Sequence, residues 1–74
     1  MTAELLCMEP GQKLDVSGEE RVYYVVAGSA RLGAEGAEVT VPAGQMAATG
    51  PQEAHHVTND GQQRLVCVVI RPAS

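Results

Sequence analysis

The chain has 74 residues, a net charge of −4 at pH 7, and neither Phe nor Trp, which fits one domain and excludes several classes of protein. Its 5 basic residues are scattered, so the sequence offers neither a basic stripe nor a set of rings on which bases could stack. No apolar run approaches the ~18 residues of a membrane span. We therefore expect no nucleic-acid partner and no membrane partner.

The first residues and the cysteines bear on where the protein resides. No basic residue precedes the short apolar piece near the N-terminus, which is not the pattern of a signal peptide, so we expect a cytoplasmic protein. Cys7 and Cys67 both lie among apolar residues, and we expect two small buried side chains rather than a disulfide or a reactive thiol. A core built from so few residues is marginal, which favours added support from a metal or a partner subunit.

Glycine and proline recur so often that few intervals could hold a helix of ~10 residues or more. Between them the residues are β-branched or alternate in polarity, which is typical of strands. Short strands at this spacing indicate a sandwich or barrel, so we predict an all-β fold with little or no helix, in one domain over residues 1–74. The predicted strands lie near 4–8, 12–16, 21–27, 30–34, 37–41, 45–49, 54–58 and 63–71.

Four turns are predicted between these strands. Gly28 allows a tight hairpin at 27–30, because glycine adopts a positive φ without strain. Further turns are predicted at 33–36, 42–44 and 59–61, where Gly, Pro, Asn and Asp gather. We expect the tail at 72–74 to be frayed.

The segments 22–26 and 65–70 are apolar on both faces of the predicted strands. A strand with one face in water should alternate between apolar and polar residues, so the second face of these strands must also be covered. In so short a chain we expect another subunit to cover it, which predicts a homodimer. The alternative is a monomer with an exposed apolar patch.

The segment 44–59, GQMAATGPQEAHHVTN, contains the only two histidines of the chain. Gly44, Pro51, His55 and Asn59 follow the order of the second motif of the cupin family, G(x)5PxG(x)2H(x)3N, with the proline displaced by one residue. Most of the chain therefore resembles a small single-domain cupin. That resemblance implies a jelly-roll-like β-barrel in which the histidine usually binds a metal.

The first cupin motif is altered in this chain. It runs G(x)5HxH(x)3–4E(x)6G, and Gly28 matches its closing glycine. Where the family has glutamate this chain has Arg21, and the two histidine positions hold Asp15 and a serine. Glu19 or Glu20 could replace that glutamate only with a shift in register, which would turn the side chain to the other face.

One hypothesis for the site is a divalent transition metal, such as Zn, Fe, Mn or Ni, bound by Asp15, Glu19 and His55. Two carboxylates and one histidine form a ligand set that suits iron or manganese. The resemblance then implies a metal-dependent cupin enzyme of the isomerase or dioxygenase type.

A second hypothesis assigns the positive charge of the site to Arg21 rather than to a metal. In the register of the first motif, Arg21, Tyr23 and His55 point into the barrel. The guanidinium would suit a small polar or anionic molecule, such as one with a carboxylate or phosphate. Alternatively, Arg21 forms a structural ion pair with Asp15 or Glu19 at the rim. The third hypothesis for the whole protein is a structural or regulatory homodimer without a ligand.

The remaining polar candidates have simpler interpretations. His56 follows His55 and should face outward by strand alternation. Asn59 should bond the backbone of its turn, and Glu53 is more typical of an exposed loop glutamate than of a general base. Packing roles are expected for Tyr23, Tyr24, Met8 and Met46.

Overall fold

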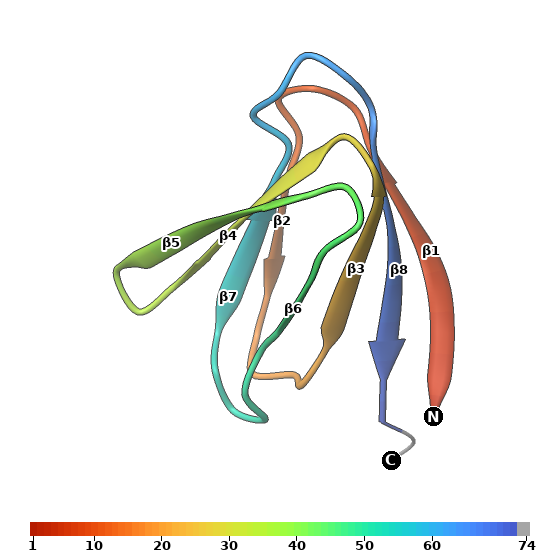
Figure 1. Cartoon of the computed structure of the whole chain (residues 1–74). Helices are drawn as coiled ribbons and strands as arrows, with labels where there is room; N and C mark the ends of the chain where they lie inside the picture. Colours follow the sequence, from red (N-terminus) through yellow and green to blue (C-terminus); the bar gives the residue numbers. More distant parts are fainter. Residues whose placement is uncertain (73–74) are drawn as a thin grey trace.

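The protein is a barrel of two four-stranded antiparallel sheets, which confirms the predicted all-β fold (Figure 1). The computed structural model describes residues 1–72, which contain no helix and hence none that could cross a membrane. All the predicted strands are present, with ends that differ by a few residues. They are β1 (Thr2–Met8), β2 (Lys13–Val16), β3 (Val22–Ala27), β4 (Ser29–Ala34), β5 (Ala37–Pro42), β6 (Met46–Ala48), β7 (His55–Thr58) and β8 (Leu65–Arg71).

Apart from the β4–β5 hairpin, consecutive strands lie in different sheets, so that residues distant in the sequence lie side by side. The first sheet has the order β1-β8-β3-β6, and the second has the order β2-β7-β4-β5. In Figure 1 the β4–β5 hairpin projects away from the other strands, while β6 runs beside β3. The barrel interior is thus bounded by β3 and β6 on one side and by β7 and β4 on the other.

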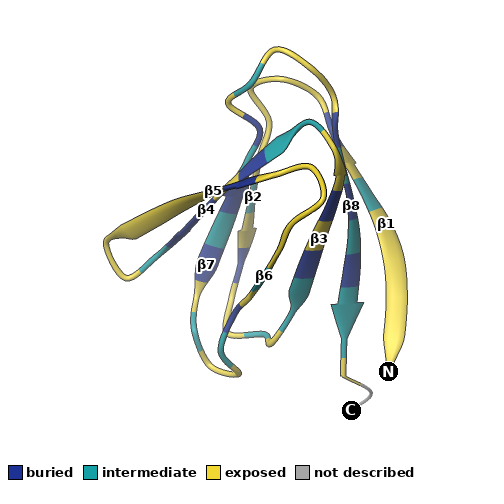
Figure 2. Cartoon of the chain, viewed as in Figure 1, coloured by how far each residue is buried: buried dark blue, intermediate teal, exposed yellow. Residues whose placement is uncertain are grey.

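The core lies between the sheets, where inward-facing residues of consecutive strands meet (Figure 2). Along β8 the burial alternates, with Leu65, Cys67 and Val69 buried and the residues between them half-buried. Full burial of a Val or Leu side chain is worth about 1.5–3 kcal/mol relative to exposure. The buried core residues are Met8, Tyr23, Val25, Ala30, Leu32, Val41, Val57, Leu65, Cys67 and Val69.

Two of the predicted buried residues are on the outside. Cys7 is exposed, because it alternates with Leu6 and Met8, which face the core. Met46 is also exposed, since it lies opposite Tyr24 on the outer side of the first sheet. The burial predicted for Cys7 and the core role predicted for Met46 were therefore wrong, whereas Met8 is in the core as predicted.

Cys67 is buried as predicted, and neither cysteine is in a disulfide. Leu6 pairs with Cys67 across β1 and β8, so Cys7 and Cys67 point to opposite faces of the sheet. Burial raises the pKa of the Cys67 thiol to about 11, which keeps it protonated and unreactive near neutral pH.

The predicted turns follow from their glycines. Gly28 has φ 76° between β3 and β4, and a Cβ there would lie 2.7 Å from the backbone oxygen of Arg64. Glu35 and Gly36 both have positive φ and join the paired residues Ala34 and Ala37, the pattern of a two-residue hairpin turn. Of the predicted frayed tail, residues 73–74 lie outside the described part of the chain.

Asn59 has the turn role predicted for it, and it also closes one end of the barrel. Its side chain is fully buried, and Nδ2 donates to the carbonyl oxygens of Met8 at 2.9 Å and Gln63 at 2.8 Å. Its Oδ1 accepts a hydrogen bond from the backbone N–H of Gly61 at 3.1 Å. One amide side chain therefore joins the end of β1 to the loop between β7 and β8.

Candidate functional site

Tyr23 and His55 meet inside the barrel. Tyr23 lies near the start of β3 and is fully buried, and His55 begins β7 and is 5% exposed. The hydroxyl oxygen of Tyr23 lies 2.7 Å from Nε2 of His55, and the two rings meet edge to face with centroids 5.5 Å apart. The contact joins the first sheet to the second, as expected for two side chains that both point inward.

The partners of His55 determine the direction of these hydrogen bonds. Its Nδ1 lies 3.3 Å from the carbonyl oxygen of Glu53, which can only accept, so the network assigns the ring proton to Nδ1. With the hydrogen on Nδ1, Nε2 accepts the hydroxyl hydrogen of Tyr23. The Tyr23 oxygen in turn accepts from Nη1 of Arg21 at 3.5 Å. Burial raises the pKa of Tyr23, and the nearby guanidinium of Arg21 opposes this shift. The phenol therefore remains a donor at neutral pH.

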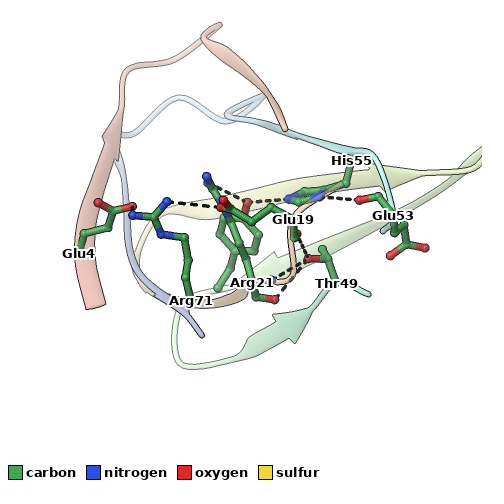
Figure 3. A network of polar contacts seen from close by, with 8 residues as sticks. Glu4, Glu19, Arg21, Thr49, Glu53, His55 and Arg71 are labelled. Carbon is green, nitrogen blue, oxygen red and sulfur yellow. Dashed lines mark hydrogen bonds and ion pairs between the residues drawn. The ribbon is translucent and has the colours of Figure 1, made fainter. Parts of the chain in front are cut away.

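Arg21 is also the inner end of a chain of ion pairs that runs to the surface (Figure 3). Its Nε donates to Oε1 of Glu19 at 2.5 Å, and Nη1 of Arg71 lies 3.4 Å from the same oxygen. Nη2 of Arg71 lies 3.2 Å from Oε1 of Glu4. The hydrogen bond from Arg21 is the main reason that the pKa of Glu19 is lowered. Because acidic and basic groups alternate along this chain, the charge of Arg21 is compensated by Glu19.

Thr49 holds this network in place by joining β3 to β6. Its backbone N–H donates to the carbonyl of Arg21 at 2.9 Å, and its Oγ1 accepts from the Arg21 N–H at 3.1 Å. The segment between β6 and β7 is braced by Glu53, whose Oε1 accepts from the N–H of Gly50 at 3.2 Å. Thr49 was missed as a site residue in the sequence, and Glu53, interpreted there as an exposed loop residue, is half-buried; both precede His55 in its own motif.

A cavity of about 240 Å³ lies beside His55 at the mouth of the barrel. It is bounded by residues of β4 and β5 on one side and of β6 on the other. Its walls combine apolar side chains with a few polar ones near His55. The apolar part includes Leu32, Val39 and Ala47, and the polar part is formed by Glu38, Thr49, Glu53 and His55.

A second, larger cavity of about 480 Å³ is lined by residues of all four strands of the second sheet and also reaches His55. The register of the sheet aligns Asp15, His56, Gly33 and Glu38 in one row across it. A Cβ at Gly33 would lie 2.3 Å from Nε2 of His56, so the imidazole of His56 covers the glycine. There it reaches Oε2 of Glu38 at 3.3 Å. His56 thus lies on the outer side as predicted, where it contributes to this cavity.

The metal site proposed from Asp15, Glu19 and His55 is not assembled in this structure. Residues 1–72 contain no group of three or more His, Cys, Asp or Glu side chains placed to hold a metal ion. The pairing of Val16 with His55 explains part of this, because Asp15 must then point to the opposite face of β2, where its side chain is 79% exposed. Glu19 is held by Arg21 and Arg71, and Nε2 of His55 is bonded to Tyr23. These residues do not fit a bound transition metal.

Comparison with known proteins identifies the family of the chain. Residues 4–71 match the model of the Cupin domain. None of the curated proteins matches the chain.

Solved structures share the fold. A predicted oxalate decarboxylase from Thermotoga maritima is 24% identical with a TM-score of 0.76, over 90% of this chain and 61% of that one. A Cupin 2 conserved barrel domain protein from Salinispora arenicola is 20% identical with a TM-score of 0.83, over 90% and 58%. The DMSP lyase DddQ from Ruegeria pomeroyi is 17% identical with a TM-score of 0.82, over 97% and 38%. The chain thus spans less than two thirds of each of these proteins.

Proposed function

Because this chain belongs to the cupin family, we propose that it binds a small polar molecule in the barrel cavity beside His55. The observation that carries the proposal is the placement of a buried, hydrogen-bonded histidine at the inner end of a cavity with largely apolar walls. Such a combination, an apolar enclosure with a few convergent polar groups, is characteristic of small-molecule sites.

The size and walls of the cavity define the class of ligand. Its volume of about 240 Å³ lies below the ~300 Å³ at which most ligand pockets begin, so it suits a compact molecule. Leu32 and Val39 would contact the apolar part of this molecule. Polar groups of the molecule would face Thr49, Glu53 and His55.

The charges of the lining favour a neutral or positively charged ligand over an anion. Glu53 lines the cavity with its carboxylate, whereas the carboxylate of Glu38 is paired with Arg31 at 2.7 Å, and Arg21 is not among the residues that line the cavity. The charge of Arg21 is moreover compensated by Glu19 at 2.5 Å. The anionic ligand expected from a free guanidinium therefore has less support than an alcohol, polyol or amine, whose N–H and O–H groups can donate to carboxylates.

A metal-dependent isomerase or dioxygenase has less support than simple binding. The oxalate decarboxylase and the DMSP lyase are 24% and 17% identical to this chain. Similarity at this level shows a shared fold and not a shared activity. In this chain, Tyr23 already occupies Nε2 of His55, the ring nitrogen that faces the interior.

A thermal-shift screen of the purified protein tests the proposal. The probes are small polyols, primary amines and carboxylates, and the expected result is a rise in melting temperature with a polyol or an amine. Val39→Phe should abolish this rise, because the larger ring fills the cavity that Val39 lines. Thr40→Phe is the matched control, since Thr40 follows on the same strand and points to the opposite face.

Two results would contradict the proposal. One is a shift of equal size in Val39→Phe and in the wild-type protein, which would place the ligand elsewhere. The other is a shift with carboxylates alone, which would restore the hypothesis of an anion bound through Arg21.

A further inference from the structure

The carboxylate of Glu53 carries a charge that the chain itself does not compensate. It lines the cavity beside His55, and in the described part of the chain no basic side chain forms an ion pair with it. The other acidic residue of the lining, Glu38, is paired with Arg31 at 2.7 Å. Figure 3 shows the carboxylate of Glu53 pointing away from the ion pairs of Arg21. The cavity therefore has one negative charge that is available to a ligand.

The two uncharged polar side chains suggested by the lining, His55 and Thr49, already have partners within the chain. Nδ1 of His55 lies 3.3 Å from the carbonyl oxygen of Glu53, and Nε2 accepts from the hydroxyl of Tyr23 at 2.7 Å. The hydroxyl of Thr49 donates to the carbonyl of Glu19 at 3.3 Å. A ligand can therefore pack against His55 and Thr49, whereas its own donors have to find another acceptor.

Glu53 offers such an acceptor and holds it in a fixed place. Its Oε1 accepts from the N–H of Gly50 at 3.2 Å, and its own N–H donates to the Gly50 carbonyl at 3.4 Å. A carboxylate has about four lone-pair sites, and among residues 1–72 this one accepts a single hydrogen bond. Because two hydrogen bonds to one glycine position the side chain before a ligand arrives, binding requires less ordering.

We propose that the ligand of this cavity is a small primary amine whose ammonium group pairs with the carboxylate of Glu53. This inference rests on the binding function proposed above and narrows its ligand to one chemical class. An ammonium group has three donors and no acceptor, which matches a site whose free polar atoms are carboxylate oxygens. A carboxylate ligand would meet a like charge there, and a polyol would bury hydroxyl groups against apolar walls without partners.

The rest of the lining determines the body of this amine. Apart from the four polar residues, the cavity is lined only by Leu, Val, Ala and Gly residues, so the body is apolar. The volume of about 240 Å³ equals that of roughly eight water molecules at ~30 Å³ each. A branched or cyclic alkylamine with up to about eight non-hydrogen atoms fits this volume.

Cyclohexylamine and cyclohexanol test the proposal, because they share one size and shape and differ only in the head group. Titration of isotope-labelled protein, followed by NMR at neutral pH, gives the dissociation constant of each probe. The wild-type protein should bind the amine at least ~5-fold more tightly, since a hydrogen bond to a charged group is stronger than one between neutral groups.

Glu53→Gln should bind the two probes with equal affinity. The substitution removes the charge and keeps the shape, and the amide oxygen can still accept from Gly50. Glu20→Gln is the matched control, since it changes the net charge equally at an exposed residue outside the lining of the cavity. It should retain the preference of the wild-type protein for the amine. Circular dichroism confirms that both variants are folded.

The outcomes separate this inference from the function on which it rests. Equal affinity of the wild-type protein for both probes overturns the assignment of an amine and still supports a binding cavity. A preference for the amine that persists in Glu53→Gln, or that is also lost in Glu20→Gln, overturns the role of Glu53. Amine binding that survives in Val39→Phe places the amine outside the cavity and overturns the inference. If the wild-type protein binds neither probe, the inference and the proposed binding function both fail.

Discussion

The hydroxyl of Tyr23 donates to Nε2 of His55 at 2.7 Å, and this contact joins the two sheets inside the barrel. The Tyr23 hydroxyl and the carbonyl of Glu53 together provide the polar partners that the buried imidazole needs. The site has thereby become a closed hydrogen-bond chain that ends at the carbonyl of Glu53.

Tyr23→Phe should lower the free energy of unfolding by about 1–3 kcal/mol, because it leaves Nε2 of His55 buried without a donor. Urea denaturation followed by circular dichroism measures the loss. Tyr24→Phe is the matched control, since Tyr24 is adjacent and on the outer side of the first sheet, and it should change stability by less than ~0.5 kcal/mol. Equal losses in the two variants would show that the Tyr23–His55 contact contributes nothing.

Glu19→Gln should destabilise the protein at neutral pH and have less effect in acid. The folded protein lowers the pKa of Glu19 from its ordinary value of 4.5 through the hydrogen bond with Arg21. A lowered carboxylate pKa gives stability that is present above the ordinary value and is lost as the pH falls through the lowered one. Thermal unfolding of both proteins at pH values above and below 4.5 should therefore show converging melting temperatures. A gap that stays constant with pH would contradict the prediction.

Gly28→Ala should destabilise the protein more than Gly44→Ala. Both glycines have positive φ, 76° and 88°, which costs an L-residue about 1–2 kcal/mol. A Cβ added at Gly28 would also lie 2.7 Å from the backbone oxygen of Arg64. A Cβ added at Gly44 would have no atom within 4 Å. The added clash should cost at least ~1 kcal/mol in chemical denaturation. Equal free energies of unfolding in the two variants would contradict the close approach of the 27–30 turn to the start of β8.

A thiol reagent should modify Cys7 well before Cys67 in the folded protein. Cys67 is fully buried, and its pKa of about 11 leaves about one part in a thousand as thiolate at pH 8. Mass spectrometry of the intact protein should show a single adduct under native conditions and two in denaturant. The Cys7→Ser variant should give no early adduct, and rapid labelling of that variant would contradict the burial of Cys67.

Much of this fold could be predicted from the sequence because residue types that favour turns, glycine above all, stand at the turns themselves. Gly28 and the Glu35–Gly36 pair define hairpins through their backbone conformations, and the residues between turns are strand formers. The direction of a side chain was harder to predict where both faces of a strand are apolar. Cys7 and Met46 could each have faced the core, and only the pairing of β1 with β8 and of β6 with β3 turns them outward.

The candidate site could be predicted in part. The motif register correctly brought Arg21, Tyr23 and His55 together, because strand alternation is set by neighbouring residues. The grouping of Asp15 with His55 failed, since it depended on how β2 pairs with β7, a long-range register that no local pattern states. The roles of Thr49 and Glu53 likewise arise from contacts made only in the folded chain.

The pairing of β1 with β8 also constrains how the molecule folds. Thr2 lies opposite Arg71, so β1 pairs with β8, a strand far away in the sequence, and β1 is joined to β3 only through β8. Pairings between residues so distant in sequence require a large loss of chain entropy before any contact compensates for it. We therefore expect the first sheet to form late in folding, and the domain to reach its native state over milliseconds to seconds.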